Sequence, residues 1–174
     1  SSVMSRRANL FINKAWGYGD EQPDHYFLAL NYRMNELTGA VALAQLQKLP
    51  QALLHRQQMA KLLCERLKNI SGISVVSAND GGEHVYWRFA ILVDEQKIKG
   101  GAFELGALLN ASGIPCSPRY IQKPAFECEV IKLQRTFGES NYPFNLASIE
   151  AVNYSKSLYS GTYYFLDHVI VFGF

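Results

Sequence analysis

A long helical pattern with a proline inside it constrains the fold of this chain most. From residue 35 to about residue 69, apolar residues recur every three or four positions, as on one face of an α-helix. Pro50 lies within this run and has no backbone N–H, so we expect the helix to kink or split there. Asn35 can cap the start of the helix with its side-chain oxygen. The first half carries small residues and few charges, which predicts close contact with neighbouring backbone.

Three later segments have the pattern of strands. Residues 85–93 alternate between two faces and form the clearest strand in the sequence, and residues 73–76 and 169–171 predict two more. Residues 80–82 predict a turn. Residues 138–147 predict a loop in which the Tyr-Pro-Phe stretch is packed or buried.

Shorter helices complete the expected fold. Residues 103–112 predict a helix that ends at Gly113, since glycine readily takes the left-handed conformation there. Residues 114–120 contain two prolines and predict an extended segment. Pro124 can open a short helix over residues 125–133. The mixture of helices and strands predicts an α/β fold, with a long kinked helix attached to a small α+β domain.

Composition excludes several classes of protein. The chain has 174 residues, of which 48% are hydrophobic and 18% charged, and its net charge is +2. The apolar content excludes a disordered tail. The near-zero charge gives no footprint of a nucleic-acid binder. A soluble domain usually carries about 25% charged residues, so some apolar surface is expected to face another chain or domain.

No membrane segment or export signal is expected. The chain has no run of 18 apolar residues and no apolar stretch near its first residues. Its three cysteines, Cys64, Cys116 and Cys128, have no metal-type spacing and are expected to be reduced thiols of a cytoplasmic protein. The histidines show no metal-ligand spacing either, so we expect no metal site.

The strongest candidate for a binding site precedes the long helix. Asn31 and Arg33 offer an amide and a planar guanidinium beside the start of a helix, where backbone N–H groups and the helix dipole favour an anion. The residues therefore predict a phosphate or carboxylate site. Alternatively, Arg33 makes a surface ion pair and Asn31 only shapes a turn.

Two further segments display polar side chains. Residues 117–124 carry Tyr120, Gln122 and Lys123 between two prolines, which could stiffen the wall of a ligand pocket or form a simple solvated connection. Residues 84–88 place His84 beside two aromatic residues and an arginine. A single histidine at the start of a strand is more often structural than catalytic. The chain contains no P-loop, nucleophile elbow or dinucleotide fingerprint.

Two stretches resemble a known family. Residues 30–49, LNYRMNELTGAVALAQLQKL, resemble the segment that follows the cofactor lysine in DegT-like sugar aminotransferases, a branch of the fold-type I pyridoxal-phosphate enzymes. Residues 113–130 and 135–144 also resemble the C-terminal part of these proteins. The matching positions in the first stretch are Asn31, Arg33, Met34, Ala40, Ala44, Gln45, Leu46 and Leu49.

The resemblance implies an interface site. Members of the family are homodimers in which the asparagine reaches the phosphate of pyridoxal 5′-phosphate in the neighbouring subunit, and here that residue would be Asn31. Arg33 is similar to a residue that supports the same site, while Tyr120, Gln122 and Lys123 would face the substrate. The implied reaction transfers an amino group from glutamate or glutamine to a keto sugar or keto-cyclitol.

The resemblance also has a gap. Family members form a Schiff base through an internal lysine that is followed by a Gly-Glu-Gly-Gly-like turn, and Lys14 lacks those surroundings. We therefore expect a C-terminal portion, inactive alone and without a catalytic residue of its own, that pairs with a second copy or with the missing large-domain half. Its expected parts are the end of a large-domain segment (1–34), an interface helix (35–70) and a small α+β domain (71–174). Alternatively, the chain is a lysine-less dimerisation or binding module.

Overall fold

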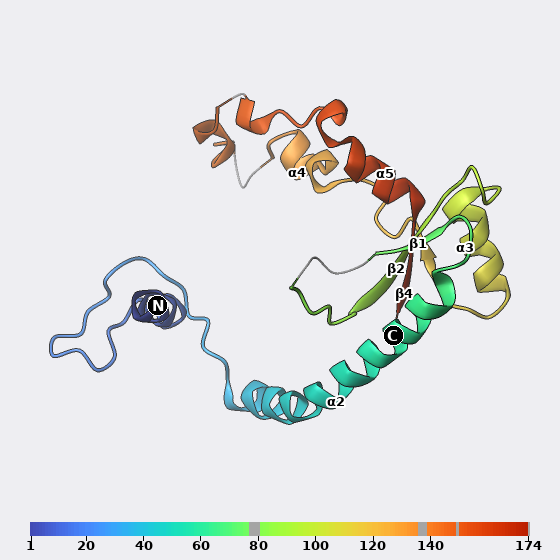
Figure 1. Ribbon diagram of the computed structural model, residues 1–174. Coiled ribbons are helices and arrows are strands. Elements are labelled where there is room, and N and C mark those ends of the chain that lie inside the picture. Colours follow the sequence, from blue (N-terminus) through green and yellow to red (C-terminus); the bar gives the residue numbers. More distant parts are fainter. Residues whose placement is uncertain (77–80, 136–138, 149, 174) are drawn as a thin grey trace. The chain divides into compact units, whose positions relative to one another are not determined.

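The computed structural model describes residues 1–76, 81–135, 139–148 and 150–173 (Figure 1). The chain divides into two compact units, Ser1–Ala52 and Leu53–Phe174. None of the described helices combines the length and hydrophobicity needed to cross a bilayer.

The first unit begins with α1 (Ser2–Ile12), a helix that the sequence patterns did not predict. Ser1 caps it by accepting a hydrogen bond from the Met4 N–H at 3.4 Å. Residues 13–35 then fold back on the end of α1, since the Tyr32 N–H donates to the Ile12 carbonyl at 2.9 Å. Ala15 is fully buried beneath this segment. The returning backbone fixes the stretch that leads into the next helix.

The long helix α2 (Glu36–Leu67) contributes to both units. Its predicted cap is confirmed, because the Asn35 side-chain oxygen accepts a hydrogen bond from the Thr38 N–H at 2.8 Å. The helix continues through Pro50 without a break, so of the two outcomes expected there, a kink or a split, the split does not occur. Pro50 removes only the bond that its N–H would give to the carbonyl of residue 46, and the turns on both sides keep theirs.

The second unit contains a four-stranded sheet. Its strands are β1 (Ile73–Val75), β2 (Arg88–Val93), β3 (Ser117–Pro118) and β4 (Val169–Gly173). They are arranged in the order β1-β2-β4-β3, and every neighbouring pair is antiparallel. The mixed helix and sheet fold that the sequence predicts is confirmed.

Of the alternation predicted for residues 85–93, the core of this unit confirms residues 89–93, whereas Val85 and Trp87 are exposed. Phe89, Ile91 and Val93 of β2 are buried, together with Ile170 of β4, Ala60 of α2 and Ala102 of α3 (Gly101–Ala111). The strand itself begins later than predicted, at Arg88. Arg88 pairs with Gly173, and β1 pairs only as far as residue 91, so no strand of the described chain lies beside residues 85–87.

The helices of the second unit agree with the predictions only in part. Helix α3 (Gly101–Ala111) matches the predicted helix, and Gly113 takes the expected left-handed conformation at φ +80°. The predicted helix 125–133 is divided into η1 (Ala125–Glu127) and α4 (Glu129–Lys132), because the intervening Cys128 is extended. Three other short turns, and the helix before β4, were not predicted: η2 (Phe144–Leu146), η3 (Glu150–Val152), η4 (Lys156–Tyr159) and α5 (Ser160–His168).

The two remaining predicted connections are the loop over residues 138–147 and the turn over residues 80–82. The Tyr-Pro-Phe stretch was expected to be packed or buried; Phe144 is half-buried, but Tyr142 is 61% exposed. Its phenol is polar at one end and η2 begins only after Pro143, so the ring stays at the surface. Residue 138 of this loop, and residue 80 of the predicted turn, lie outside the described residues.

Candidate functional site

The predicted anion site lies in the first unit, on the stretch that enters α2. The Asn31 side-chain oxygen accepts a hydrogen bond from the Arg33 N–H at 3.2 Å, which closes a tight turn. Asn31 also forms a β-bridge with Asn13 at the end of α1. The amide of Asn31 therefore uses its acceptor within the turn, and its NH₂ donors remain for a ligand.

Tyr18 orients the side chain of Arg33. The guanidinium carbon lies 5.2 Å from the centre of the Tyr18 ring, and Nη1 donates a hydrogen bond to the Tyr18 hydroxyl at 3.3 Å. In the part of the chain that the structure describes, no carboxylate forms an ion pair with Arg33. The surface ion pair considered as an alternative is thus not formed among these residues. Arg33 keeps an unneutralised charge and further N–H donors.

These donors fit a phosphate group chemically. Arg33 can bind two oxygen atoms through its planar N–H edge, and the amide of Asn31 can donate to a third. Both side chains are exposed, so a ligand can reach them. The N–H groups at the start of α2 add a partial positive charge, although Asn35 already accepts one of them.

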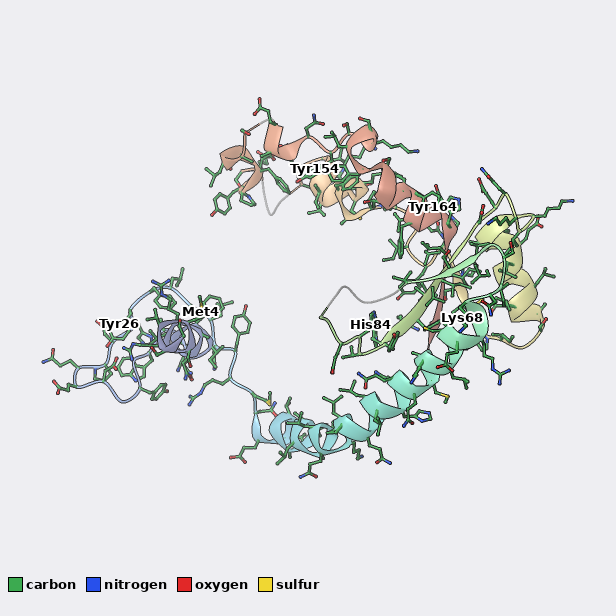
Figure 2. All side chains as sticks on the ribbon, in the orientation of Figure 1. Met4, Tyr26, Lys68, His84, Tyr154 and Tyr164 are labelled. Atoms are coloured by element: carbon green, nitrogen blue, oxygen red, sulfur yellow. The ribbon has the colours of Figure 1, made fainter. Side chains whose placement is uncertain are left out.

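A second polar network supports the same unit. Arg6 of α1 binds both carboxylate oxygens of Asp20, at 3.0 and 2.7 Å, and the hydroxyl of Tyr26 donates to Asp20 at 2.7 Å. The hydrogen bond from Arg6 is the main cause that lowers the pKa of Asp20. Figure 2 shows Tyr26 on the loop that follows α1. A cavity of about 380 Å³ lies beside this network, and Arg6, Trp16 and Tyr18 are among its lining residues.

The three predicted substrate residues share one loop of the second unit. Tyr120, Gln122 and Lys123 follow β3 and are all exposed. Tyr120 makes a cation–π contact with Arg88, whose guanidinium carbon lies 5.5 Å from the centre of the Tyr120 ring. This loop belongs to the second unit, whereas the Asn31–Arg33 turn belongs to the first.

His84 has a local partner that gives it a structural role. Its Nδ1 accepts a hydrogen bond from the Tyr86 N–H at 2.9 Å, and the two rings lie 4.3 Å apart. This acceptor role places the proton of a neutral ring on Nε2. Figure 2 shows His84 on the segment that leads into β2. The contact supports the structural interpretation rather than a catalytic one.

An aromatic cluster before β4 escaped the sequence patterns. Phe126 stacks on Tyr154 with ring centres 5.4 Å apart, and it also contacts Tyr159 and Tyr163. The Tyr163 hydroxyl donates to the Glu127 carboxylate, and this bond raises the pKa of Tyr163 to about 12. These residues are far apart along the chain and follow no helical or strand period. No local sequence signal could have found them.

The described residues include no group of three or more metal-ligating side chains. Cys64, Cys116 and Cys128 are unpaired thiols. Burial raises the pKa of Cys116, which makes its thiolate less available.

The sequence matches a known protein family. A sequence profile of the DegT/DnrJ/EryC1/StrS aminotransferase family matches residues 4–147, which include Asn31, Arg33 and the loop that carries Tyr120. No curated protein sequence matches the chain.

Solved structures show the same fold over part of their length. S. venezuelae DesV, in complex with a ketimine intermediate, has a TM-score of 0.68 and 17% identity over 99% of this chain and 39% of its own. The sugar aminotransferase CalS13 from Micromonospora echinospora has a TM-score of 0.65 and 16% identity, covering 99% and 40%. The aminotransferase TlmJ from Streptoalloteichus hindustanus has a TM-score of 0.63 and 11% identity over 99% of this chain and 40% of its own. The chain thus spans about two fifths of the length of these proteins.

Proposed function

Because the chain belongs to the DegT/DnrJ/EryC1/StrS aminotransferase family, we propose that it is part of an enzyme that transfers an amino group to a keto sugar or keto-cyclitol. Glutamate or glutamine is the proposed donor, and pyridoxal 5′-phosphate the proposed cofactor. The observation that carries the proposal is Arg33, which Tyr18 orients beside Asn31 and which no described carboxylate neutralises.

In this proposal Asn31 and Arg33 bind the phosphate of the cofactor. When bound, pyridoxal phosphate supplies the electron-withdrawing ring that allows the amino group to be exchanged. The guanidinium of Arg33 offers paired N–H donors and charge, and the Asn31 amide offers further donors. Tyr18 limits the rotamers of Arg33, so less conformational entropy is lost when the phosphate binds.

The contact is proposed to act across a subunit interface. Asn31 and Arg33 would serve the cofactor of a neighbouring copy, while Tyr120, Gln122 and Lys123 would form part of the substrate wall. The sugar aminotransferase CalS13 has the same fold, which supports a sugar as the class of substrate. The three unpaired cysteines suit a cytoplasmic setting, where thiols stay reduced.

By itself the chain is proposed not to catalyse the reaction, because none of its lysines has the sequence surroundings of the family's Schiff-base lysine. An alternative function is a non-catalytic dimerisation module. The exposed apolar residues in the first half of α2, such as Leu37 and Leu46, favour it.

Calorimetric titration with pyridoxamine 5′-phosphate tests the phosphate contact. This probe has no aldehyde, so it cannot form imines with surface lysines. We expect weak binding that falls about tenfold in Arg33→Ala, as for the loss of a charge-assisted hydrogen bond. Arg7→Ala, an exposed arginine on α1, is the matched control and should bind as the parent does. Pyridoxamine without phosphate should not bind.

Two results would contradict the proposal. Equal affinity of Arg33→Ala and the parent would remove Arg33 from the site. Equal affinity for pyridoxamine and its phosphate would remove the phosphate as the recognised group. Circular dichroism of each variant shows whether a loss of binding reflects a loss of fold.

A further inference from the structure

Arg88 in the second unit is an arginine held by two aromatic rings. Its guanidinium carbon lies 5.1 Å from the centre of the Trp87 ring and 5.5 Å from that of the Tyr120 ring. The three residues come from the start of β2 and from the loop after β3. Cation–π attraction uses none of the five N–H donors of a guanidinium as hydrogen bonds, so these donors remain for other partners.

The charge of Arg88 has no ion-pair partner among the residues that the structure describes. Cation–π contacts orient an arginine without neutralising it. A carboxylate partner would have satisfied the N–H edge and favoured a purely structural role. Here the edge keeps both its charge and its directional donors.

Gly173 keeps space beside this edge. It pairs with Arg88 across β2 and β4, and a Cβ at position 173 would lie 3.1 Å from Nη1 of Arg88. A Cβ at this position would require the guanidinium to shift by a few tenths of an ångström. Trp87 is 66% exposed and Tyr120 47% exposed, so both rings are also accessible to a ligand.

We infer that Trp87, Arg88 and Tyr120 form an oxyanion-binding corner that anchors an anionic group of a sugar ligand, a phosphate or a carboxylate. Arg88 would bind two oxygens through its N–H edge, and the exposed rings would cover the adjacent part of the ligand. The inference deepens the proposed function and rests on it in one respect, since Tyr120 belongs to the proposed substrate wall. It adds Trp87 and Arg88, which the sequence had not singled out as binding residues.

Fluorescence of Trp87 provides the test. The chain has two tryptophans, Trp16 and Trp87, so Trp16→Phe leaves Trp87 as the only reporter. This full-length variant is titrated with glucose 1-phosphate, glucuronate and glucose, and calorimetry gives the affinities independently. We expect a saturable response to one or both anionic sugars and none to glucose. The response to phosphate or to carboxylate identifies which oxyanion the corner takes.

Substitutions at position 88 separate charge from geometry. Arg88→Ala should weaken binding of the anionic sugar at least tenfold, whereas Arg88→Lys should keep part of it, because lysine retains the charge without the planar edge. Arg66→Ala, an exposed arginine at the end of α2, is the matched control and should bind as the parent does. Higher salt should weaken the parent's binding.

The inference is overturned if Arg88→Ala binds the anionic sugars as tightly as the parent, or if glucose binds as well as they do. Absence of any response in the parent overturns it too. The Arg88→Lys variant and circular dichroism keep the test valid if Arg88→Ala folds poorly. Binding of these probes needs neither cofactor nor amino transfer. A failure here therefore leaves the Arg33 contact standing, and a failure of Arg33 leaves this corner standing.

Discussion

A single hydrogen bond sets the titration of Tyr163. The bond to the Glu127 carboxylate is the main cause that raises its pKa to about 12, and burial adds to it. Below about pH 10 the phenol is protonated in the folded and unfolded states alike, so the bond contributes fully. Between about pH 10 and 12 the unfolded chain loses this proton first. The folded state then binds more protons, and stability falls as the pH rises.

This dependence predicts the effect of Glu127→Gln. Removal of the carboxylate should move the ionisation of Tyr163 from about pH 12 toward the usual value near 10. Ultraviolet titration of the parent minus that of Tyr163→Phe isolates the contribution of this one tyrosine. Glu129→Gln, whose carboxylate pairs with Arg135 instead, should leave the titration unchanged. An unchanged midpoint in Glu127→Gln would show that the carboxylate does not control Tyr163.

Packing between α3 and β3 depends on a glycine. Gly106 is buried in α3, and a Cβ there would lie 2.7 Å from two ring carbons of Pro118 in β3. The proline ring cannot rotate away, so either the helix or the strand must shift. The close approach of these two elements therefore requires glycine at position 106.

Gly106→Ala is expected to destabilise the chain by about 1–3 kcal/mol through overpacking. Gly161→Ala in α5 is the matched control, because a Cβ there meets open space. It should raise stability by about 0.5 kcal/mol, since alanine loses less entropy in a helix. Urea unfolding measures both. A Gly106→Ala variant at least as stable as the parent would mean that α3 and β3 are not closely packed.

At the same scale, the sequence predicts elements whose signals are local. The alternation in β2, the left-handed Gly113 and the Asn35 cap each depend on neighbouring residues, and all three are confirmed. Helix α1 was not predicted, although Met4, Ala8, Phe11 and Ile12 recur at helical spacing. Local sequence patterns could not predict the side-chain contacts of the candidate sites. Arg33 meets Tyr18 across 15 positions and Tyr163 meets Glu127 across 36, distances that no period encodes.

At the scale of the whole molecule, the first half of α2 leaves its apolar residues in water. Ala60 alone is buried among the residues of this helix, all of which the structure describes. In its first half Leu37 is 77% exposed, Val41 55% and Leu46 61%. Leu37 and Val41 lie one turn apart on the same face of the helix. Exposed apolar residues that share a face mark interaction surfaces. The low charged fraction of the sequence has the same implication, because fewer charges cover the surface.

The proposed homodimer therefore predicts concentration-dependent association through the first half of α2. Sedimentation velocity of the parent should show dimers at micromolar concentration. Val41→Glu should shift the population toward monomers, because a charge is costly to bury at an apolar interface. Gln47→Glu changes charge equally at another exposed position of the same helix and should dimerise as the parent does. Circular dichroism confirms that both variants remain helical. A parent that stays monomeric throughout, or a Val41→Glu variant that still dimerises, would show that this face does not hold two copies together.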